Sequence, residues 1–488
     1  MTARISQKVA VSVVYVAAMF MSIMDATIVN VALPTIGRDF GVPATSVASI
    51  SIYFLVSLAV FISASGWLGD RFGGKRVLLA AIAVFTGASA LCGLAGSLTQ
   101  LDIFRVLQGM GGGMMAPVGL AMLFRVFPPA ERIRASAILT VPTTLAPALG
   151  PVIGGLLVTD LSWRWVFYVN VPLGALSIAF GLIFLSGGTH QQVGRFDLPG
   201  FALAGAGLGS LMYGLSEGPV QGWRTPAVLG SVAAGAVLLA ALAAVELRGR
   251  APLLDLRLLC NRLFRSSNIV MIMGSAAFIG TLFVVSLYYQ DGRGMSALAA
   301  GLSTFPEAIG VMAGAQLASR LIYPRLGPRR HVALGLAGVA VMIGLMSLAG
   351  EQTSLWWMRL LMFGLGVAMG QVFVPTQAAA FATISAPATG RASTMFNVVR
   401  QVGGAAGVAL FTSVVVAVGA TRVIAGHVVP DLTAYHAAFL VAAGLALIGA
   451  AAALTIHDAD AAATMVRRGR QEAGEPGSRA GRTVPETG

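Results

Sequence analysis

Several charged residues stand inside long apolar stretches of this sequence, where an unpaired charge is costly. Asp25, Arg105 and Glu307 are the main ones, each within an apolar run of about 20 residues. Burying an unpaired charge costs several kcal/mol, so such residues are kept for a function or paired. A carboxylate that alternates between apolar and salt-bridged surroundings can bind a proton on one side and release it on the other. The two acids therefore predict proton binding, with Arg105 as the responding cation.

Asp25 is the main candidate for the proton site and for pairing with a cationic substrate. It lies about 13 Å inside its run, and Arg105 has a similar depth in another run, so the two could meet. Asn30 and Gln108 are expected to contact the substrate as well. Two alternatives remain open. Asp25 and Arg105 could form a static lock between helices, or Arg105 could pair locally with Asp102 three residues earlier.

Glu307 is the second anomaly, because it lies about 15 Å deep and has no cation one helical turn away. Its neighbour Pro306 interrupts a helical hydrogen bond and could turn the acid toward a cavity. Glu307 would suit recognition of a cationic substrate or a second proton site; the alternative is a protonated structural glutamate. Arg400, about 12 Å inside its own run, is a candidate partner or gate residue. Alternatively, it extends to the membrane surface.

Composition places these residues in a membrane protein. Of the 488 residues, 57% are hydrophobic and only 10% are charged, whereas a soluble domain carries about 25% charge. Fourteen apolar segments are long enough to span a bilayer as all-α structure. They are 9–33, 46–67, 77–97, 101–124, 134–158, 164–186, 198–216, 226–246, 266–289, 297–321, 332–350, 355–376, 392–418 and 434–456.

The distribution of charge predicts that both termini lie in the cytoplasm. The net charge of +13 could suggest a nucleic-acid partner, but most of the 32 basic residues fall in the short loops that this orientation places inside. No nucleic-acid binding is therefore expected. The opposite loops hold only five arginines, which are Arg38, Arg164, Arg224, Arg293 and Arg422.

A weak internal repeat divides the chain. "RFGGKR" at 71–76 recurs as "RLGPRR" at 325–330, and "RVLQGMGGGMMA" at 105–116 recurs as "RLLMFGLGVAMG" at 359–370, an offset of 254 residues both times (325 − 71 and 359 − 105). This repeat predicts two six-helix bundles with an inserted helix pair between them. The expected divisions are 1–190 for the N-terminal bundle, 191–250 for the pair, 251–460 for the C-terminal bundle and 461–488 for a disordered cytoplasmic tail.

These motifs, in this order, resemble the fourteen-span drug:proton antiporters of the major facilitator superfamily. The resemblance covers about residues 9–456. It rests on "MDATIVNVALP", "GWLGDRFGGKR", "LDIFRVLQGMGGG", "GPVIGG" and "WRWVFYVNVPLG". It implies a major-facilitator-type fold, two six-helix bundles with two inserted helices.

The resemblance also implies roles in conformational change. The loop motif would act as a latch that is made and broken as the two sides open, and the proline- and glycine-rich helix would form a pliable gate. The alternatives are a solvated basic turn and plain helix packing. The residues concerned are Asp70, Arg71, Gly73, Lys75 and Arg76 in the loop, and Gly150, Pro151, Gly154 and Gly155 in the helix.

The sequence therefore predicts an antiporter of the cytoplasmic membrane, and not an enzyme. It would export lipophilic, cationic, drug-like compounds in exchange for protons, as a monomer, with no metal or other cofactor. The partners are an amphipathic small molecule, protons and lipid. No GxxxxGK[ST] motif indicates ATP hydrolysis. The main alternative is a dedicated exporter of one endogenous metabolite or antibiotic; a non-transporting sensor and an intramembrane enzyme rank lower.

Overall fold

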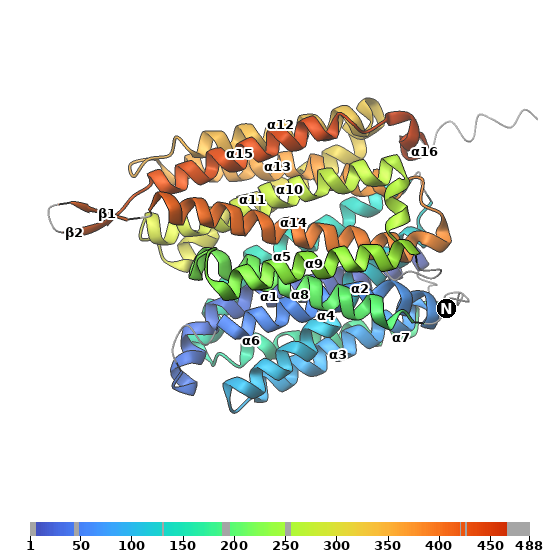
Figure 1. The fold of residues 1–488 in the computed structure, drawn as a ribbon, viewed down its shortest axis with the longest axis horizontal. Helices are drawn as coiled ribbons and strands as arrows, with labels where there is room; N and C mark the ends of the chain where they lie inside the picture. The colour runs from blue at the N-terminus through green and yellow to red at the C-terminus, as the bar shows by residue number, and fades with distance from the viewer. Residues whose placement is uncertain are drawn as a thin grey trace, which may run out of the picture.

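The computed structural model describes residues 6–42, 48–128, 131–187, 196–248, 255–419, 421–424 and 427–465. Long helices lie side by side, and one β-hairpin projects from an end of the molecule (Figure 1). The helices are α1 (Gln7–Phe40), α2 (Ala48–Phe72), α3 (Gly74–Leu94), α4 (Leu98–Val126), α5 (Arg132–Asp160), α6 (Trp165–Tyr168), α7 (Asn170–Phe184), α8 (Leu198–Gln221), α9 (Pro226–Arg248), α10 (Arg262–Leu287), α11 (Ala297–Leu317), α12 (Tyr323–Met346), α13 (Leu355–Ala380), α14 (Thr389–Val418), α15 (Thr433–Ala453) and α16 (Ala462–Met465). The hairpin is β1 (Thr421–Ile424) and β2 (His427–Pro430), paired antiparallel.

The predicted all-helical membrane fold is confirmed. Twelve segments within the described ranges are long and apolar enough to cross a membrane, and one of them, Ala299–Met346, contains both α11 and α12. The number of fourteen spans and the cytoplasmic position of the termini stay predictions. The two boundaries of the expected inserted pair fall at 188–195 and 249–254, outside the described residues.

Short polar side chains fix where several helices begin. The Ser97 hydroxyl accepts a hydrogen bond from the backbone N–H of Gln100 at the start of α4. Asn261 caps α10 and Ser296 caps α11 in the same way. Such caps satisfy backbone donors that the first helical turn leaves unpaired, so each long apolar run enters its helix at a defined residue.

The helices form two bundles with the inserted pair beside them. Helices α1–α7 pack on one another, as do α10–α15, while α8 and α9 pack together and α8 contacts α2 and α14. Between the bundles, α2 and α4 meet α14, and α5 meets α11 and α13. Each bundle has its own apolar core, and the core of the first extends to Phe381 and Phe396 of the second.

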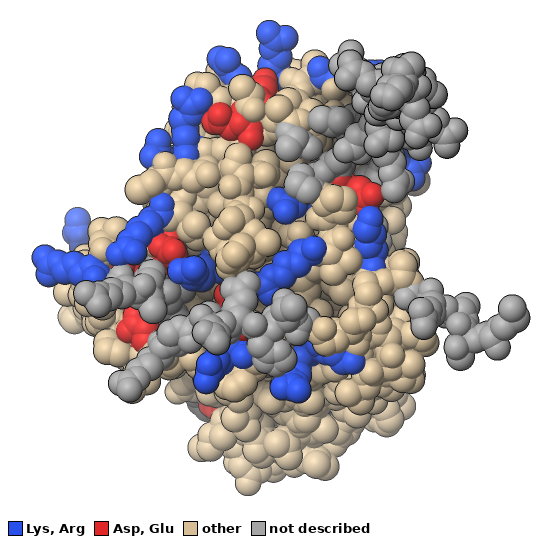
Figure 2. All heavy atoms as spheres, turned by 90° about the vertical axis from the view of Figure 1, so that its right-hand side faces the viewer, with Lys and Arg blue, Asp and Glu red and all other residues tan. Residues whose placement is uncertain are grey.

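Many basic side chains gather at one end of the molecule, which we call the basic end. This end carries the N-terminus and α16, and Figure 2 shows lysines and arginines spread across it. The hairpin β1–β2 marks the opposite end, called the hairpin end. A charged end of this kind is consistent with the predicted cytoplasmic face.

Direct hydrogen bonds join the two bundles toward the basic end. Ser65 of α2 lies 3.1 Å from the Thr394 hydroxyl of α14, and the Ser393 hydroxyl donates to the Pro117 carbonyl of α4 at 2.7 Å. Arg132, at the start of α5, donates to the Phe381 carbonyl just after α13. This end of the bundle interface is therefore closed in the described conformation.

Three features differ from the sequence expectations. The expected span 164–186 is broken into α6 and α7. The apolar loop before α15 forms a hairpin that the sequence did not predict. The expected tail is wrong at its start. Ala461–Met465 is packed on the protein, with Thr464 only 3% exposed and bonded to Tyr323 at 2.6 Å; residues 466–488 lie outside the described part.

Candidate functional site

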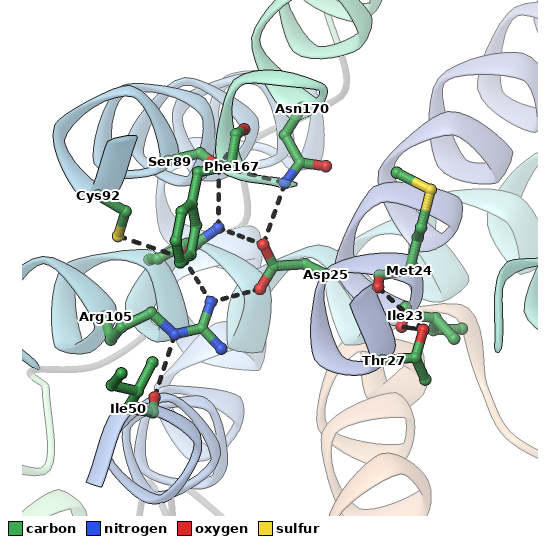
Figure 3. A network of polar contacts seen from close by, with 11 residues as sticks. Ile23, Met24, Asp25, Thr27, Ile50, Ser89, Cys92, Arg105, Phe167 and Asn170 are labelled. Carbon is green, nitrogen blue, oxygen red and sulfur yellow. Dashed lines mark hydrogen bonds and ion pairs between the residues drawn. The ribbon is translucent and has the colours of Figure 1, made fainter. Parts of the chain in front are cut away.

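A cluster of polar side chains lies inside the N-terminal bundle, around the Asp25 carboxylate (Figure 3). We call it the Asp25 cluster. Its members come from four helices, which makes it a junction of α1, α3, α4 and α7, and each is fully or almost fully buried. The cluster consists of Asp25, Ser89, Arg105, Gln108 and Asn170.

Three donors surround the Asp25 carboxylate. The Arg105 Nη1 lies 2.5 Å from Oδ2, and Oδ1 accepts from Gln108 Nε2 at 2.8 Å and from Asn170 Nδ2 at 3.0 Å. The predicted meeting of Asp25 with Arg105 is therefore present. Because Asp25 is 0% exposed, no substrate reaches it in this conformation, and its predicted substrate contact stays untested.

The Arg105 guanidinium is satisfied on several sides as well. Its Nε donates to the Ile50 carbonyl of α2 at 3.1 Å, and Nη1 also lies 2.6 Å from Gln108 Oε1. Its face covers the Phe54 ring at 4.1 Å. Arg105 does not form the local ion pair with Asp102, whose carboxylate accepts from Ser49 at 3.0 Å instead. A buried ion pair needs such additional partners to offset its loss of hydration.

Glycines of α4 let the neighbouring helices approach closely enough to enclose the cluster. A Cβ on Gly109 would stand 2.8 Å from the Ser57 side chain of α2, and one on Gly111 would stand 2.6 Å from the backbone of Phe85 in α3. Since these glycines alternate between two partner helices, α4 fits tightly between α2 and α3. The glycine-rich motif after Arg105 thus positions the arginine.

The break between α6 and α7 supplies the remaining partner of Asp25. Asn170 is the first residue of α7, and its side chain bridges Asp25 and Ser89. The Ser89 hydroxyl in turn donates to the Phe167 carbonyl of α6 at 2.9 Å. The sequence reading missed both Asn170 and Ser89, although Asn170 lies in the quoted stretch "WRWVFYVNVPLG". A polar amide in an apolar run was the available signal.

The predicted gate helix α5 packs on α1 close to Asp25. An added Cβ on Gly150 would collide with the Thr27 side chain, and one on Gly154 would stand 2.9 Å from Ile28. Thr27 points away from the Asp25 cluster and donates to the Met24 carbonyl at 2.9 Å (Figure 3).

The structure describes few contacts, or none, for three other predicted residues. No described atom lies within 4 Å of the position a Cβ would take on Gly155. The side chains of Pro151 and Asn30 lie outside the described part.

The predicted latch lies at the basic end. Asp70 is 3% exposed and pairs with Arg125 of α4 at 2.5 Å. A Cβ on Gly390, in the first turn of α14, would stand 2.9 Å from the Asp70 carboxylate. The acid of one bundle therefore faces the N-terminal end of a helix in the other, a favourable position for a negative charge.

The rest of the loop has separate roles. Gly73 precedes α3 with φ of 86°, which favours glycine. Lys75 donates to the Leu182 carbonyl at 3.1 Å and to the Leu185 carbonyl, at the end of α7. Arg71 and Arg76 are exposed.

Glu307 and Arg400 lie apart from the Asp25 cluster, and no ion pair joins them to each other within the described residues. Glu307 is 5% exposed and its Oε1 has no described hydrogen-bond partner. Its backbone packs on Gly366 of α13. Arg400 is half-buried and donates to Asn397 Oδ1 at 3.4 Å. The suggested pairing of the two is absent in this conformation.

Comparison with known proteins identifies the class of protein to which this fold and these motifs belong. The family model of the Major Facilitator Superfamily matches residues 15–408, so the chain belongs to that superfamily. It is a multi-pass protein of the cell membrane and a transporter, not an enzyme.

Individual relatives are similar over most of their length. The chain is 33% identical to a "Multidrug resistance protein B homolog" of Mycobacterium tuberculosis, over 82% of this chain and 74% of that one. It is also 33% identical to the "Tetracenomycin C resistance and export protein" of Streptomyces glaucescens, over 89% and 79%. The solved structure of the human organic anion transporter MFSD10 shares the fold, with a TM-score of 0.63 at 16% identity, covering 92% of this chain and 100% of that one.

Proposed function

We propose that this transporter is a proton-coupled antiporter that exports lipophilic, cationic, drug-like compounds by alternating access. It would act as a monomer, driven by the proton gradient without a cofactor. The observation that carries the proposal is the buried Asp25 cluster, an ionisable pair inside the membrane part of a transporter. Relatives named for multidrug resistance and for antibiotic export support the direction and the kind of cargo.

Protonation of Asp25 is the proposed coupling step. The proton cancels the charge that faces Arg105, so the 2.5 Å ion pair loses its electrostatic attraction. Gln108 and Asn170 donate to the same carboxylate and also to Ser89, so the change acts directly on α1, α4 and α7 and reaches α3 through Ser89. A network that has one arrangement with the acid charged and another with it neutral is a two-state element, as coupling requires.

The second step is the movement of the bundles against each other. The contacts at the basic end close that side in the described conformation, and the Asp70–Arg125 pair lies beside Gly390 of the other bundle. Opening the basic end must separate Gly390 from Asp70 and break the hydrogen bonds of Ser393 and Arg132. Asp70 should therefore affect the transport rate more than the choice of substrate.

Glu307 is the proposed recognition group for the cationic part of the substrate. It is buried in α11, a helix that packs against α5 of the other bundle, and its Oε1 has no described partner. A carboxylate there would pair with an amine or quaternary ammonium that enters between the bundles.

The test is ethidium transport in proteoliposomes with an imposed pH gradient. Asp25→Asn should reduce gradient-driven ethidium transport to the level of empty liposomes, because the neutral side chain keeps the shape but binds no proton. Asp39→Asn, on the same helix but largely exposed, is the matched control and should keep transport. Retained ethidium binding by Asp25→Asn shows that the variant is folded. Gradient-driven transport by Asp25→Asn would place the proton site elsewhere.

A second candidate is a dedicated exporter of one metabolite or antibiotic. The similarity to a tetracenomycin resistance and export protein favours it. The same proteoliposomes with a panel of cationic, neutral and acidic aromatic compounds distinguish the two. Transport of a single chemical scaffold supports the dedicated exporter, whereas transport of several unrelated cations supports the multidrug antiporter.

A further inference from the structure

Arg400 lies deep in the second bundle, without a carboxylate partner in the described part of the chain. It follows the first residue of α14, Thr389, by eleven positions, which is about 16 Å along the helix. That distance is more than twice what an arginine side chain spans, so the guanidinium does not simply lie in water at the basic end. A cation at this depth requires a partner or a function.

The hydrogen bonds of Arg400 leave most of its donors free. Among the described residues, it donates only to Asn397 Oδ1, at the long distance of 3.4 Å. By comparison, Arg105 has an acid, an amide and a carbonyl as acceptors. Arg359 stacks on Trp356 at 4.9 Å, although its buried Nε has no hydrogen-bond partner among the described residues. A guanidinium has five N–H donors in a planar fork, so Arg400 retains the capacity to bind an oxyanion with two parallel bonds.

The position of Arg400 is at the meeting of the two bundles. Helix α14 packs on α2 and α4 of the other bundle, and Arg400 lies within electrostatic range of Tyr15 of α1. One turn further along α14, Gly403 and Gly404 pack on α10, and earlier in the helix Ser393 bonds α4. The segment of α14 that carries Arg400 therefore lies between α4 of the first bundle and α10 of the second.

We infer that Arg400 is an anion-binding subsite for the transported compound. This inference rests on the proposed export function and extends its cargo to lipophilic organic acids, such as aromatic carboxylates. The planar carboxylate matches the guanidinium fork, and the apolar part of the ligand can pack between the bundles.

The direct test compares two ligands that differ only in charge, 2-naphthoate and 2-naphthamide, by calorimetric titration of the purified protein. Arg400→Gln should weaken naphthoate binding at least about tenfold, because a charge-assisted bidentate contact is worth more than 1.4 kcal/mol, while naphthamide binding stays unchanged. Arg359→Gln is the matched control, an intramembrane arginine that stacks on the exposed Trp356. Equal loss for both ligands, or no loss for naphthoate, overturns the inference.

A second measurement needs no variant. Phenylglyoxal modifies accessible arginines, and naphthoate should protect Arg400 from it at least about threefold in peptide mass spectrometry, with naphthamide giving no protection. Absence of protection overturns the subsite.

A lipid phosphate could present the same chemistry to Arg400. If Arg400→Gln lowers the anionic phospholipid that copurifies and leaves naphthoate binding intact, Arg400 binds lipid and the inference is wrong. Ethidium transport by Arg400→Gln reports separately on the proposed antiport.

Discussion

The two bundles carry an arginine at corresponding positions of the repeat, yet they use it differently. Arg105 is 1% exposed and pairs with Asp25, whereas Arg359, 254 residues later, is half-buried and stacks on Trp356. At the same offset, Asp25 corresponds to Ile279, so the second bundle has no acid at this position. The two halves of the repeat share the arginine, but only the first contains the buried ion pair.

The basic loops of the two bundles, at 71–76 and 325–330, also differ in the acid that lies beside each. In the first, Asp70 is part of α2 and pairs with Arg125. In the second, the corresponding residue is Pro324, and the acid comes from the chain's C-terminal segment. Asp458 Oδ1 accepts from the Arg329 backbone N–H at 2.8 Å, beside Gly327 with φ of 70°. The first loop's acid therefore pairs within its own bundle and also stands beside Gly390 of the opposite bundle, whereas the second loop is held by the C-terminal segment.

The largest expected effect concerns the two arginines. Arg105→Met leaves Asp25 buried without its counter-charge, which costs about 3–5 kcal/mol. Arg359→Met removes mainly a cation–π contact, worth about 0.5–1 kcal/mol. The melting temperature in detergent should therefore fall much further for Arg105→Met. Equal losses would show that the ion pair contributes no more than the stacked arginine, and the comparison of the bundles would fail.

Glu307→Gln tests whether the second bundle recognises charge. The substitution keeps size and removes the negative charge, so transport of ethidium should fall several-fold while a neutral dye, Nile red, is affected little. Asp25→Asn, by contrast, should abolish gradient-driven transport of both. An equal fall for the two dyes in Glu307→Gln would argue against charge recognition and favour a structural glutamate.

Asp458 and Asp460 form a matched pair for the second loop. Asp458→Ala removes a charge-assisted hydrogen bond and should cost about 1–3 kcal/mol. Asp460 forms an exposed pair with Arg262 at 3.4 Å, so Asp460→Ala should cost about 0–1 kcal/mol. Thermal unfolding measures both.

Removal of residues 466–488 should have little effect on the melting temperature. A large effect would show that the segment beyond Met465 contributes to the fold.

The smallest effect is expected at the hairpin end. Hydrogen bonds from Trp163 and Arg164 hold the pKa of Asp39 below its ordinary value. A carboxylate of this kind adds stability above its unfolded pKa of about 4 and loses it as the pH falls through the folded pKa. Below about pH 4, the wild type should approach the melting temperature of Asp39→Asn. A constant difference down to lower pH would contradict the linkage.

Much of the architecture was predictable because apolar length is a local property. Runs of about 20 apolar residues need neither partner nor context to predict helices, and all-helical structure follows from the absence of water in the membrane. The repeat at one offset indicated two bundles. The charged residues within the runs, above all Asp25 and Arg105, stood out for the same reason: a charge in an apolar run is visible without knowing its neighbours.

Only the tertiary structure decided which groups meet. Asn170 and Ser89 reach Asp25 because a helix break and a close helix crossing bring them there, and neither is encoded by a local pattern. Arg105 pairs with Asp25 and not with nearby Asp102, because side-chain direction, and not spacing along the helix, determines contact. The acid of the second loop came from Asp458, 129 residues from its partner Arg329. Long-range contacts of this kind depend on packing, which a single sequence does not reveal.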